Sequence, residues 1–340
     1  MTQAVQVDIL DLRHFSASSL KPLLDVENQA WSERLHWNYR TSIDLILQYL
    51  DSRVLPGFVA VEGARVIGYV FCVYEDAKAV IGDVFSLGSS DGRLSAQEIE
   101  RQLLEQLIQM LQHSPGTERI ESQLLLHPSG RMGPVFRAHD FQVFQRDFMA
   151  MALTAAASSV GVSVPAGLRM RAWTEEDFTP AAHLISEAYA GHLDSRINDQ
   201  YQTIPGSLRF LHNIVRFPGC GIFDAAASRV LVSESTGEMA GALLCSRVQE
   251  KIGHVTQVCM APRWRRRGLA AMLLQDCAAQ LRNRGFESLT LTVTQANHEA
   301  VRLYERLGFT RIHSFDAMLW TRSETAMAAK TGIGFALYRP

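Results

Sequence analysis

The sequence predicts an α/β protein in which one unit of strands and helices occurs twice in tandem. Two observations lead to this prediction. A β-hairpin pattern occurs at residues 58–71 and again at 229–246, and both times it follows a short strand and helical segments. A strand, a helix and a further strand then follow each hairpin in the same order. Because the order of elements is shared, we interpret the chain as an internal repeat of one unit.

The size and composition of the chain limit the classes of protein that it can be. With 340 residues, 47% of them hydrophobic, the chain can fill two cores. A net charge of −2 argues against a general nucleic-acid-binding protein. Residues 1–5 lack the basic start and apolar run of a signal peptide, and no apolar run approaches the roughly 18 residues that span a membrane. We therefore expect a cytoplasmic protein with no nucleic-acid or membrane partner.

The cysteines are scattered along the chain and form no C-x-x-C pair. Such spacing indicates neither a zinc site nor a disulfide framework. Most of them lie in apolar runs, so we expect buried, reduced thiols and no bound metal. The five are Cys72, Cys220, Cys245, Cys259 and Cys277.

Residues 1–153 are expected to form the first unit. The helix predicted at 96–111 is its clearest element, because its apolar residues recur at intervals of three and four. The other elements follow from alternating or continuous apolar runs bounded by turn residues. Strands are expected at 7–10, 79–87, 120–126 and 141–152, a hairpin at 58–71, and further helices at 19–26, 39–50 and 132–138.

Residues 168–324 are expected to form the second unit, which repeats this order. Residues 154–167 are rich in alanine, serine, glycine and valine, so we interpret them as a linker. Residues 325–340 form a tail to which we assign no role. The elements expected before the central stretch of the unit are a strand at 168–171, helices at 174–189 and 204–217 and a hairpin at 229–246, and a strand at 312–321 closes the sheet.

The most informative stretch of the second unit is a strand followed by an arginine-rich turn and a helix. The apolar run 255–260 predicts a buried strand that ends before Pro262. The turn Arg263–Ala270 contains four arginines and one glycine and leads into a helix with apolar residues at a period of 3.6. Unpaired N–H groups at the start of a helix favour a bound anion. Taken alone, this pattern fits a phosphate site and a solvated basic turn equally well.

Two motifs in this unit together resemble the GNAT family of acyl-CoA N-acyltransferases. Arg265-x-x-Gly268-x-Ala270 is similar to the family's pyrophosphate-binding pattern, Q/R-x-x-G-x-G/A. Asn297 and the run 303–309 are similar to the family's last helix, N-x-x-A-x-x-L-Y-x-x-x-G-F. The resemblance implies an α/β (α+β) fold of two tandem GNAT domains, each a mixed, mostly antiparallel sheet flanked by helices. It also implies acetyl-CoA as the co-substrate.

The resemblance assigns most of the candidate site residues. The strand is expected to bind the pantetheine arm and the thioester carbonyl, and the turn to bind the phosphates. Tyr304 is expected to protonate the leaving thiolate, although a core tyrosine on an amphipathic helix is the alternative. Asn297 is expected to contact the cofactor, to cap its helix, or both. The expected cofactor-binding residues are Val258, Cys259, Met260, Arg265, Arg266, Arg267, Gly268, Leu269, Ala270, Ala271 and Asn297.

The general base is the least determined of these assignments. Many family members have a glutamate on the strand before Asn297, but residues 289–294 contain no acid. His254 lies near a second position that the family uses, and we expect it at the mouth of a cleft, where a histidine would suit base catalysis. Glu250 and Glu187 are the other candidates. A surface histidine without a catalytic role is the alternative for His254.

The first unit lacks both motifs. In place of the arginine-rich turn it has Gly88–Ser95, which contains a single arginine and an aspartate that would repel phosphate. Aligning the ends of the two units places Phe136 opposite Tyr304 and Ser129 opposite Asn297. We infer a degenerate copy that supports the second unit or shapes its substrate cleft. An unrelated α/β domain is the alternative.

The sequence therefore predicts an N-acetyltransferase that moves an acetyl group to a primary amine of a small molecule by direct attack, catalysed by the second unit. We expect a monomer or a homodimer. The alternatives are a protein or peptide N-acetyltransferase and a non-catalytic acyl-CoA-binding regulatory protein. Asp194 and Asp199 are expected to hold a cationic amine. The polar residues expected around the acceptor are Tyr189, His192, Asp194, Arg196, Asp199 and Tyr201.

Overall fold

The computed structural model describes residues 6–153, 164–217, 219 and 221–322. Residues 154–163 of the predicted linker and the predicted tail, 325–340, lie outside these residues. The described cysteines, Cys72, Cys245, Cys259 and Cys277, are free and buried, as expected. Among the described residues, no helix is both long enough and apolar enough to cross a membrane.

The first half of the chain contains the elements that the sequence predicts, in the predicted order. The last predicted strands, 141–152, form one continuous strand. Along the chain the elements are β1 (Val7–Asp11), η1 (Leu12–His14), α1 (Ala17–Leu35), α2 (Arg40–Asp51), β2 (Gly57–Glu62), β3 (Arg65–Glu75), β4 (Lys78–Ser86), α3 (Ala96–His113), β5 (Arg119–Gln123), α4 (Gly133–Ala138) and β6 (Gln142–Ala152).

The second half repeats the order and adds short elements that the sequence did not reveal, namely α6, η3, β8 and η5. The elements are β7 (Leu168–Ala172), η2 (Glu175–Asp177), α5 (Phe178–Ala188), α6 (Leu193–Ile197), η3 (Asp199–Tyr201), α7 (Ile204–Arg216), β8 (Ile222–Phe223), β9 (Arg229–Ser233), β10 (Met239–Gln249), β11 (Ile252–Met260), η5 (Pro262–Trp264), α8 (Leu269–Asn283), β12 (Ser288–Thr294), α9 (His298–Arg306) and β13 (Thr310–Thr321).

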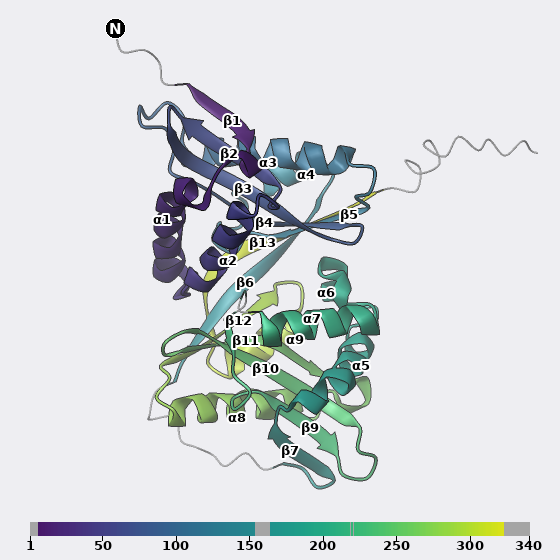
Figure 1. Cartoon of the computed structure of the whole chain (residues 1–340). Coiled ribbons are helices and arrows are strands. Elements are labelled where there is room, and N and C mark those ends of the chain that lie inside the picture. Colours follow the sequence, from purple (N-terminus) through teal and green to yellow (C-terminus); the bar gives the residue numbers. More distant parts are fainter. Residues whose placement is uncertain (1–5, 154–163, 218, 220, 323–340) are drawn as a thin grey trace, which may run out of the picture.

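The strands of both halves join in one sheet. Its order is β1-β2-β3-β4-β5-β13-β6-β12-β11-β10-β9-β7, with β8 paired to β10 outside this path. Most neighbours are antiparallel, and β4–β5 and β11–β12 are parallel. In Figure 1 the first half lies above and the second half below, and the long strand β6 runs from one into the other. The fold is therefore the mixed, mostly antiparallel sheet that the resemblance implied.

The two halves exchange their last strands. Among the described strands, β6 of the first half pairs with β12 and β13 of the second half, and Arg146 faces Thr294 on β12 and Phe315 on β13. In return, the second half's β13 pairs with β5 of the first half, where Leu319 faces Glu121. Each half thus completes the sheet of the other. The division into units at residues 1–153 and 168–324 stays a prediction, because the sheet has no break between them.

An opening in the sheet lies between β11 and β12. The two strands pair in parallel from Ile252 to Val255 and then separate, so residues 256–260 have no partner on β12. A bulge opposite Leu244 and Cys245 on β10 leaves Thr256 unpaired in the register, and its hydroxyl donates to the Leu244 carbonyl at 3.2 Å. Bulges re-aim side chains and backbone at the rim of a sheet. The edge of β11 is thereby turned toward the opening.

The first half has the corresponding opening, but it is filled. Strands β4 and β5 pair from Lys78 to Ile81 and then separate. The ring Nε2 of His127 lies 2.7 Å from the Val84 carbonyl on the separated part of β4. His127 is buried, and burial lowers its pKa to about 4, so the ring is neutral at pH 7 and donates from Nε2 to that carbonyl. This bond occupies the backbone edge that is open in the second half.

A cluster of aromatic and aliphatic side chains fills the junction between the halves. Trp37 packs against Phe148 and His254, and Phe315 and Val248 belong to the same cluster. The cluster joins α1 and the segment after it to β6, β10 and β13. Because these side chains come from both halves, burial of their apolar surface stabilises the arrangement of the halves as well as each half.

Candidate active site

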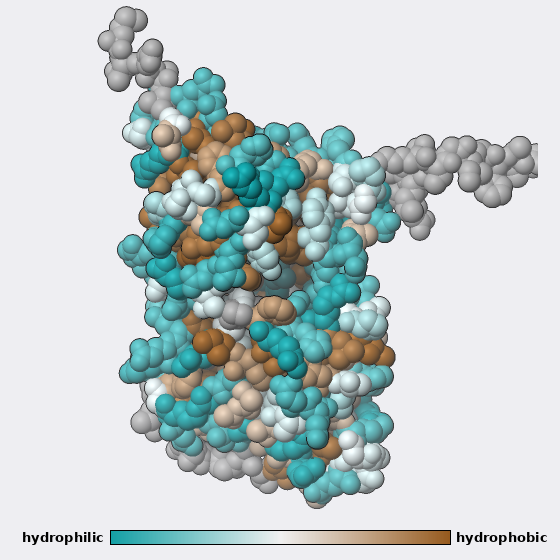
Figure 2. Space-filling view, viewed as in Figure 1, coloured by the Kyte–Doolittle hydropathy of each residue, from teal (hydrophilic) through white to brown (hydrophobic). Residues whose placement is uncertain are grey.

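A cavity of about 970 Å³ begins at the opening between β11 and β12. Elements of both halves line it. Figure 2 shows the face of Figure 1 hollowed at mid-height, where the halves meet. All but one of the residues predicted to bind the cofactor, together with Tyr304 and His254, line the cavity, and Arg267 is the exception. Those that do are His254, Val258, Cys259, Met260, Arg265, Arg266, Gly268, Leu269, Ala270, Ala271, Asn297 and Tyr304.

The N-terminus of α8 offers free backbone N–H groups to this cavity. Gly268 is the N-cap residue with φ 75°, in the left-handed region, and no side chain caps the helix. The first intrahelical bond runs from the Met272 N–H to the Gly268 carbonyl, so the N–H groups of residues 269–271 have no helical acceptor. A Cβ added at Gly268 would meet nothing within 4 Å. An anion can therefore approach the backbone closely here.

The arginines of the turn have different roles. Arg265 bends inward, and its guanidinium donates to the carbonyls of Ala188, at 2.5 Å, and Met260, at 3.4 Å. Arg266, at φ 60°, is exposed and pairs with Glu299 at 2.7 Å. Arg267 stacks over the Trp264 ring, 4.8 Å from its centroid, and does not line the cavity. Its prediction as a cofactor-binding residue is therefore not supported by its position.

The edge of β11 is held by a side-chain network that the sequence did not reveal. The Val258 N–H donates to Oε1 of Gln257 at 2.9 Å, and the Tyr189 hydroxyl donates to the same oxygen at 2.8 Å. Gln257 is buried, and its Nε2 has no hydrogen-bond partner. This amide is a donor aimed at no protein group. Burial raises the pKa of the neighbouring Cys259 thiol to about 12, so it stays protonated and is a poor nucleophile.

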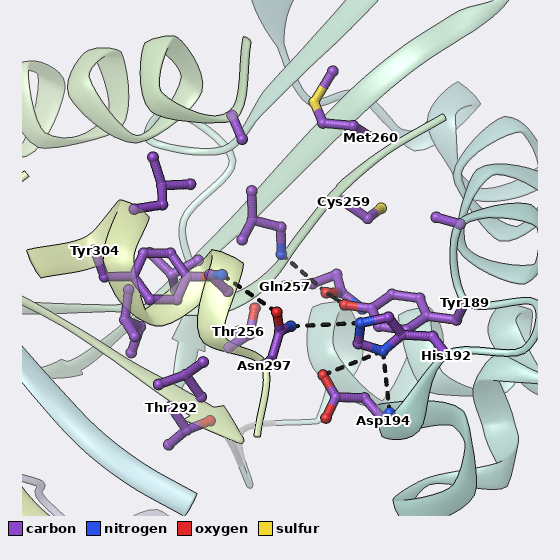
Figure 3. A pocket seen from close by; sticks show the side chains of 18 of the residues that line it. Tyr189, His192, Asp194, Thr256, Gln257, Cys259, Met260, Thr292, Asn297 and Tyr304 are labelled. Carbon is purple, nitrogen blue, oxygen red and sulfur yellow. Dashed lines mark hydrogen bonds and ion pairs between the residues drawn. The ribbon is translucent and has the colours of Figure 1, made fainter. Parts of the chain in front are cut away.

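Tyr304 and Asn297 lie on the other side of the opening, on and just before α9 (Figure 3). The Asn297 side chain caps the helix by accepting from the Ala300 N–H at 3.3 Å. Tyr304 is buried, its ring packs on Phe309, and its hydroxyl makes no hydrogen bond to another described residue. Burial raises the pKa of Tyr304 well above its ordinary value, so the phenol carries its proton at all ordinary pH values.

His254 does not lie at the mouth of the cleft, and that prediction is wrong. The residue is 5% exposed, its Nδ1 lies 2.8 Å from the Thr290 hydroxyl, and its ring packs between Trp37 and Phe148. Burial, with a smaller effect of the Arg146 charge, lowers its pKa to about 3. A histidine of such low pKa binds a proton too weakly to serve well as a base near neutral pH.

Replacement of His254 by leucine is expected to flatten the pH dependence of stability. The ring has a pKa of about 3 in the folded protein and about 6.5 when unfolded. Between these values only the unfolded state binds the proton, so stability falls as the pH falls below about 6.5. From pH 7 to 5 this group alone costs on the order of 2 kcal/mol. Urea unfolding of both proteins at both pH values measures it. If the free energy of unfolding fell equally in both proteins from pH 7 to pH 5, His254 would not take up a proton on unfolding.

A second histidine faces the cavity from the segment before α6. The His192 Nδ1 accepts from the Asp194 N–H at 3.1 Å and lies 3.7 Å from the Asp194 carboxylate. Asp194 also accepts from the Thr294 hydroxyl at 2.5 Å. The His192 Nε2 lies 3.5 Å from Asn297 (Figure 3). The His192–Asp194 pair lies in the segment where the sequence predicts the acceptor. His192 thus has a carboxylate beside it, whereas His254 has none. The earlier candidates Glu250 and Glu187 do not line the cavity.

Partly buried ion pairs hold the segment expected around the acceptor, residues 189–201, against the first half. The Lys78 ammonium lies 2.6 Å from Asp199, 2.8 Å from Glu75 and 3.6 Å from Glu121. Burial opposes its charge, but these carboxylates outweigh burial and raise the pKa of Lys78. Arg119 donates to the Arg196 carbonyl at 2.5 Å. Asp199 therefore neutralises protein cations and does not line the cavity, which argues against its predicted contact with a substrate amine.

Replacement of Lys78 by methionine is expected to destabilise the protein by about 3 kcal/mol, because it leaves three carboxylates without their shared cation. The loosened segment should also raise the KM for the acceptor more than it lowers kcat. Thermal unfolding and steady-state kinetics measure both effects. Lys21→Met is the matched control, since its ammonium is about half exposed and pairs with the exposed Asp25. If Lys78→Met lost no more stability than Lys21→Met, Lys78 would not hold this segment in place.

The equivalent helix in the first half offers no such anion site. The Ser95 hydroxyl caps α3 by accepting from the Glu98 N–H at 3.2 Å. In the loop before it, the Glu62 carboxylate accepts from the Ser90 N–H at 2.8 Å. Two N–H groups around this helix start are thus occupied, one of them by a negative charge. No group of three or more His, Cys, Asp or Glu side chains suited to a metal occurs among the described residues.

Comparison with known proteins agrees with this geometry. The model of the acetyltransferase (GNAT) family matches residues 192–309. The mycothiol acetyltransferase of Thermobispora bispora is 48% identical over 60 residues, which are 18% of this chain and 20% of that protein. The chain thus aligns with about a fifth of the length of this curated relative.

Solved structures show the same fold over nearly the whole chain. A GCN5-related N-acetyltransferase from Sphaerobacter thermophilus superposes with a TM-score of 0.64 at 17% identity, covering 93% of this chain and 95% of that one. A tandem GNAT protein from the clavulanic acid biosynthesis pathway gives 0.56 at 15% identity, with 94% and 100% covered. Residues 192–309 thus match the GNAT acetyltransferase family, and nearly the whole chain has the fold of solved GNAT structures, among them a tandem GNAT protein. The predicted resemblance to this family and the predicted fold are confirmed.

Proposed function

We propose that the chain transfers an acetyl group from acetyl-CoA to a primary amine of a small molecule, at the cavity of the second half. The uncapped N-terminus of α8 supports this proposal most directly. It supplies unpaired N–H groups, a left-handed glycine and open space at the end of the opening between β11 and β12. These features suit the pyrophosphate of the cofactor, and the pantetheine arm would then run along residues 256–260.

The chemistry that we propose is a direct attack of the amine on the thioester. The Tyr304 phenol, which keeps its proton, would donate it to the leaving thiolate. The His192–Asp194 pair would bind the ammonium and take its proton, and we propose this pair in place of the buried His254. The high pKa of the Cys259 thiol argues against an acyl-enzyme on this residue. The Gln257 amide, whose Nε2 is unpaired, is placed to donate to a substrate oxygen.

A small acceptor suits the site better than a protein chain does. The acceptor end of the cavity is walled by Trp37, Gln123, Leu125 and Arg146 of the first half, so an extended polypeptide would meet these side chains. In architecture alone, the layout resembles that of mycothiol synthase and some antibiotic N-acetyltransferases, and no acceptor is transferred from them. We also propose that the protein acts as a monomer or homodimer in the cytoplasm, without a nucleic-acid or membrane partner.

The test is release of CoA from acetyl-CoA in the presence of a panel of small amines, followed by mass spectrometry of the product. Turnover with at least one amine and none with the matching alcohols is expected. Cofactor binding without turnover of any amine would favour the alternative, a non-catalytic acyl-CoA-binding regulator. Acetylation of a peptide at a rate above every small amine would replace the small acceptor by a polypeptide.

A further inference from the structure

A single arginine of the first half reaches the acceptor end of the cavity. Arg146 lies on β6, the strand that the first half contributes to the second, and its side chain is half-buried on the cavity wall. The guanidinium donates to the Gln123 side-chain oxygen and to the Thr292 hydroxyl at 3.3 Å, and it lies 5.8 Å from the Phe315 ring centroid. These neighbours fix its orientation, and all of them are neutral.

No carboxylate of the described residues contacts this guanidinium. Within the described residues, Arg146 forms no ion pair, and the carboxylate of its neighbour Asp147 accepts from Gln295 at 2.8 Å and Ser314 at 2.6 Å. A guanidinium has five N–H donors, of which two are used here, and the Nε group is buried without a partner. A half-buried cation with neutral partners and unused donors is costly unless a ligand supplies the anion.

The position of Arg146 relative to Asp194 indicates which ligand group it would meet. Arg146 bonds Thr292, whereas Asp194 bonds Thr294, the next residue of β12 on the same face of the sheet. Two residues of a strand span about 7 Å. Arg146 also faces Thr294 directly across the β6–β12 pair, so both charged groups stand over one short stretch of sheet. The cavity thus holds a cation and an anion above alternate residues of one strand face, an arrangement that suits a small zwitterion.

We propose that Arg146 binds a carboxylate of the acceptor, and that the acceptor is an amino carboxylate whose ammonium lies at the His192–Asp194 pair. The inference rests on the proposed function, because it names the substrate class of that site. A guanidinium binds a carboxylate through two parallel N–H bonds, which fixes the orientation of the ligand. The cofactor phosphates have their own place at the N-terminus of α8, so they do not need this arginine. Arg146 is accordingly a specificity-determining residue.

The test compares amino carboxylates with their primary amides. A panel of α-, β- and γ-amino acids and the matching amides is assayed with acetyl-CoA. The wild type is expected to prefer the best acid over its amide by about a hundredfold in kcat/KM. Arg146→Met should bring this ratio near one, and Arg146→Lys should leave an intermediate ratio, because it keeps the charge but not the fork. Both variants should keep the wild-type Kd for acetyl-CoA.

Arg311→Met is the matched control, because Arg311 is an exposed arginine of the neighbouring strand β13 outside the cavity, and it should keep the wild-type ratio. Equal use of acids and amides by the wild type would overturn the proposal. So would a preference for succinyl-CoA over acetyl-CoA that is lost in Arg146→Met, since the carboxylate would then belong to the acyl donor.

A binding measurement separates this inference from the proposed function. Titration of the same acids and amides into CoA-loaded protein does not require turnover. Acid-selective binding that Arg146→Met abolishes would support the inference even if no amine were acetylated, in which case only the proposed reaction would fail. Binding of acids and amides with equal affinity would overturn the inference even in an active enzyme.

Discussion

Gly268→Glu is expected to abolish the binding of acetyl-CoA. Glycine at this N-cap has φ 75°, and a Cβ there would point into open space, so the new side chain can be accommodated at a cost of about 1 kcal/mol. Its carboxylate would then stand where the pyrophosphate is expected. Two like charges at 4 Å repel by about 4 kcal/mol near a protein surface, which is roughly a thousandfold in Kd.

Isothermal titration with acetyl-CoA measures this effect. One site per chain is expected for the wild type and none for the variant. Gly268→Ala is the matched control, because it carries the same backbone strain without the charge, and it should lower affinity only slightly. Unchanged affinity in Gly268→Glu would contradict the phosphate site. Two sites in the wild type would show that the first half also binds the cofactor, in spite of its occupied loop N–H groups.

Tyr304→Phe is expected to lower kcat by about a hundredfold and to leave the Kd for acetyl-CoA unchanged. The Tyr304 hydroxyl makes no hydrogen bond to another described residue, so its removal should not disturb the fold. What is lost is the proton for the leaving thiolate, which is poorly solvated in a buried site.

The acid role can be separated from a structural one by changing the leaving group. With acetyl thioesters of more acidic thiols the thiolate needs less help, so the difference between wild type and Tyr304→Phe should shrink. Pre-steady-state CoA release isolates the chemical step from product release. Equal rates for both proteins with acetyl-CoA would remove Tyr304 as the acid, and a difference independent of the thiol would assign it a positioning role.

The sequence brought together the residues that line the proposed cofactor end of the cavity, because that end is local. The strand, the turn and the helix that form it are consecutive in the chain, so motif and geometry coincide at Gly268 and Asn297. The acceptor end could not be predicted in this way. Arg146 and Gln123 belong to the other half of the chain and reach the cavity only through the exchange of β6 and β13, which no local pattern reports.

Two errors have physical causes of the same kind. The helix predicted at 19–26 ends too early, because α1 continues to Leu35. Glu27 interrupts the apolar spacing in the sequence, but it is buried and accepts from the Tyr69 hydroxyl at 2.7 Å. His254 looked accessible because it stands near the start of its strand. Its ring is covered by Trp37 and Phe148, and both are far from it in sequence. In both cases the structure depends on side chains that are far away in the sequence.

The exchange of strands has a consequence for how the chain acquires its structure during synthesis. Every sheet partner of β6 lies on β12 and β13, so when residue 152 leaves the ribosome this strand has neither of its neighbours. Both edges of β6 stay unpaired until some 140 to 170 further residues have been made. Unpaired strand edges favour aggregation, so the risk of aggregation is highest during this interval. The first half cannot complete its own sheet before then, because the strand that pairs with β5 is β13. We expect these late, long-range pairings to be the slow step of folding and to occur together.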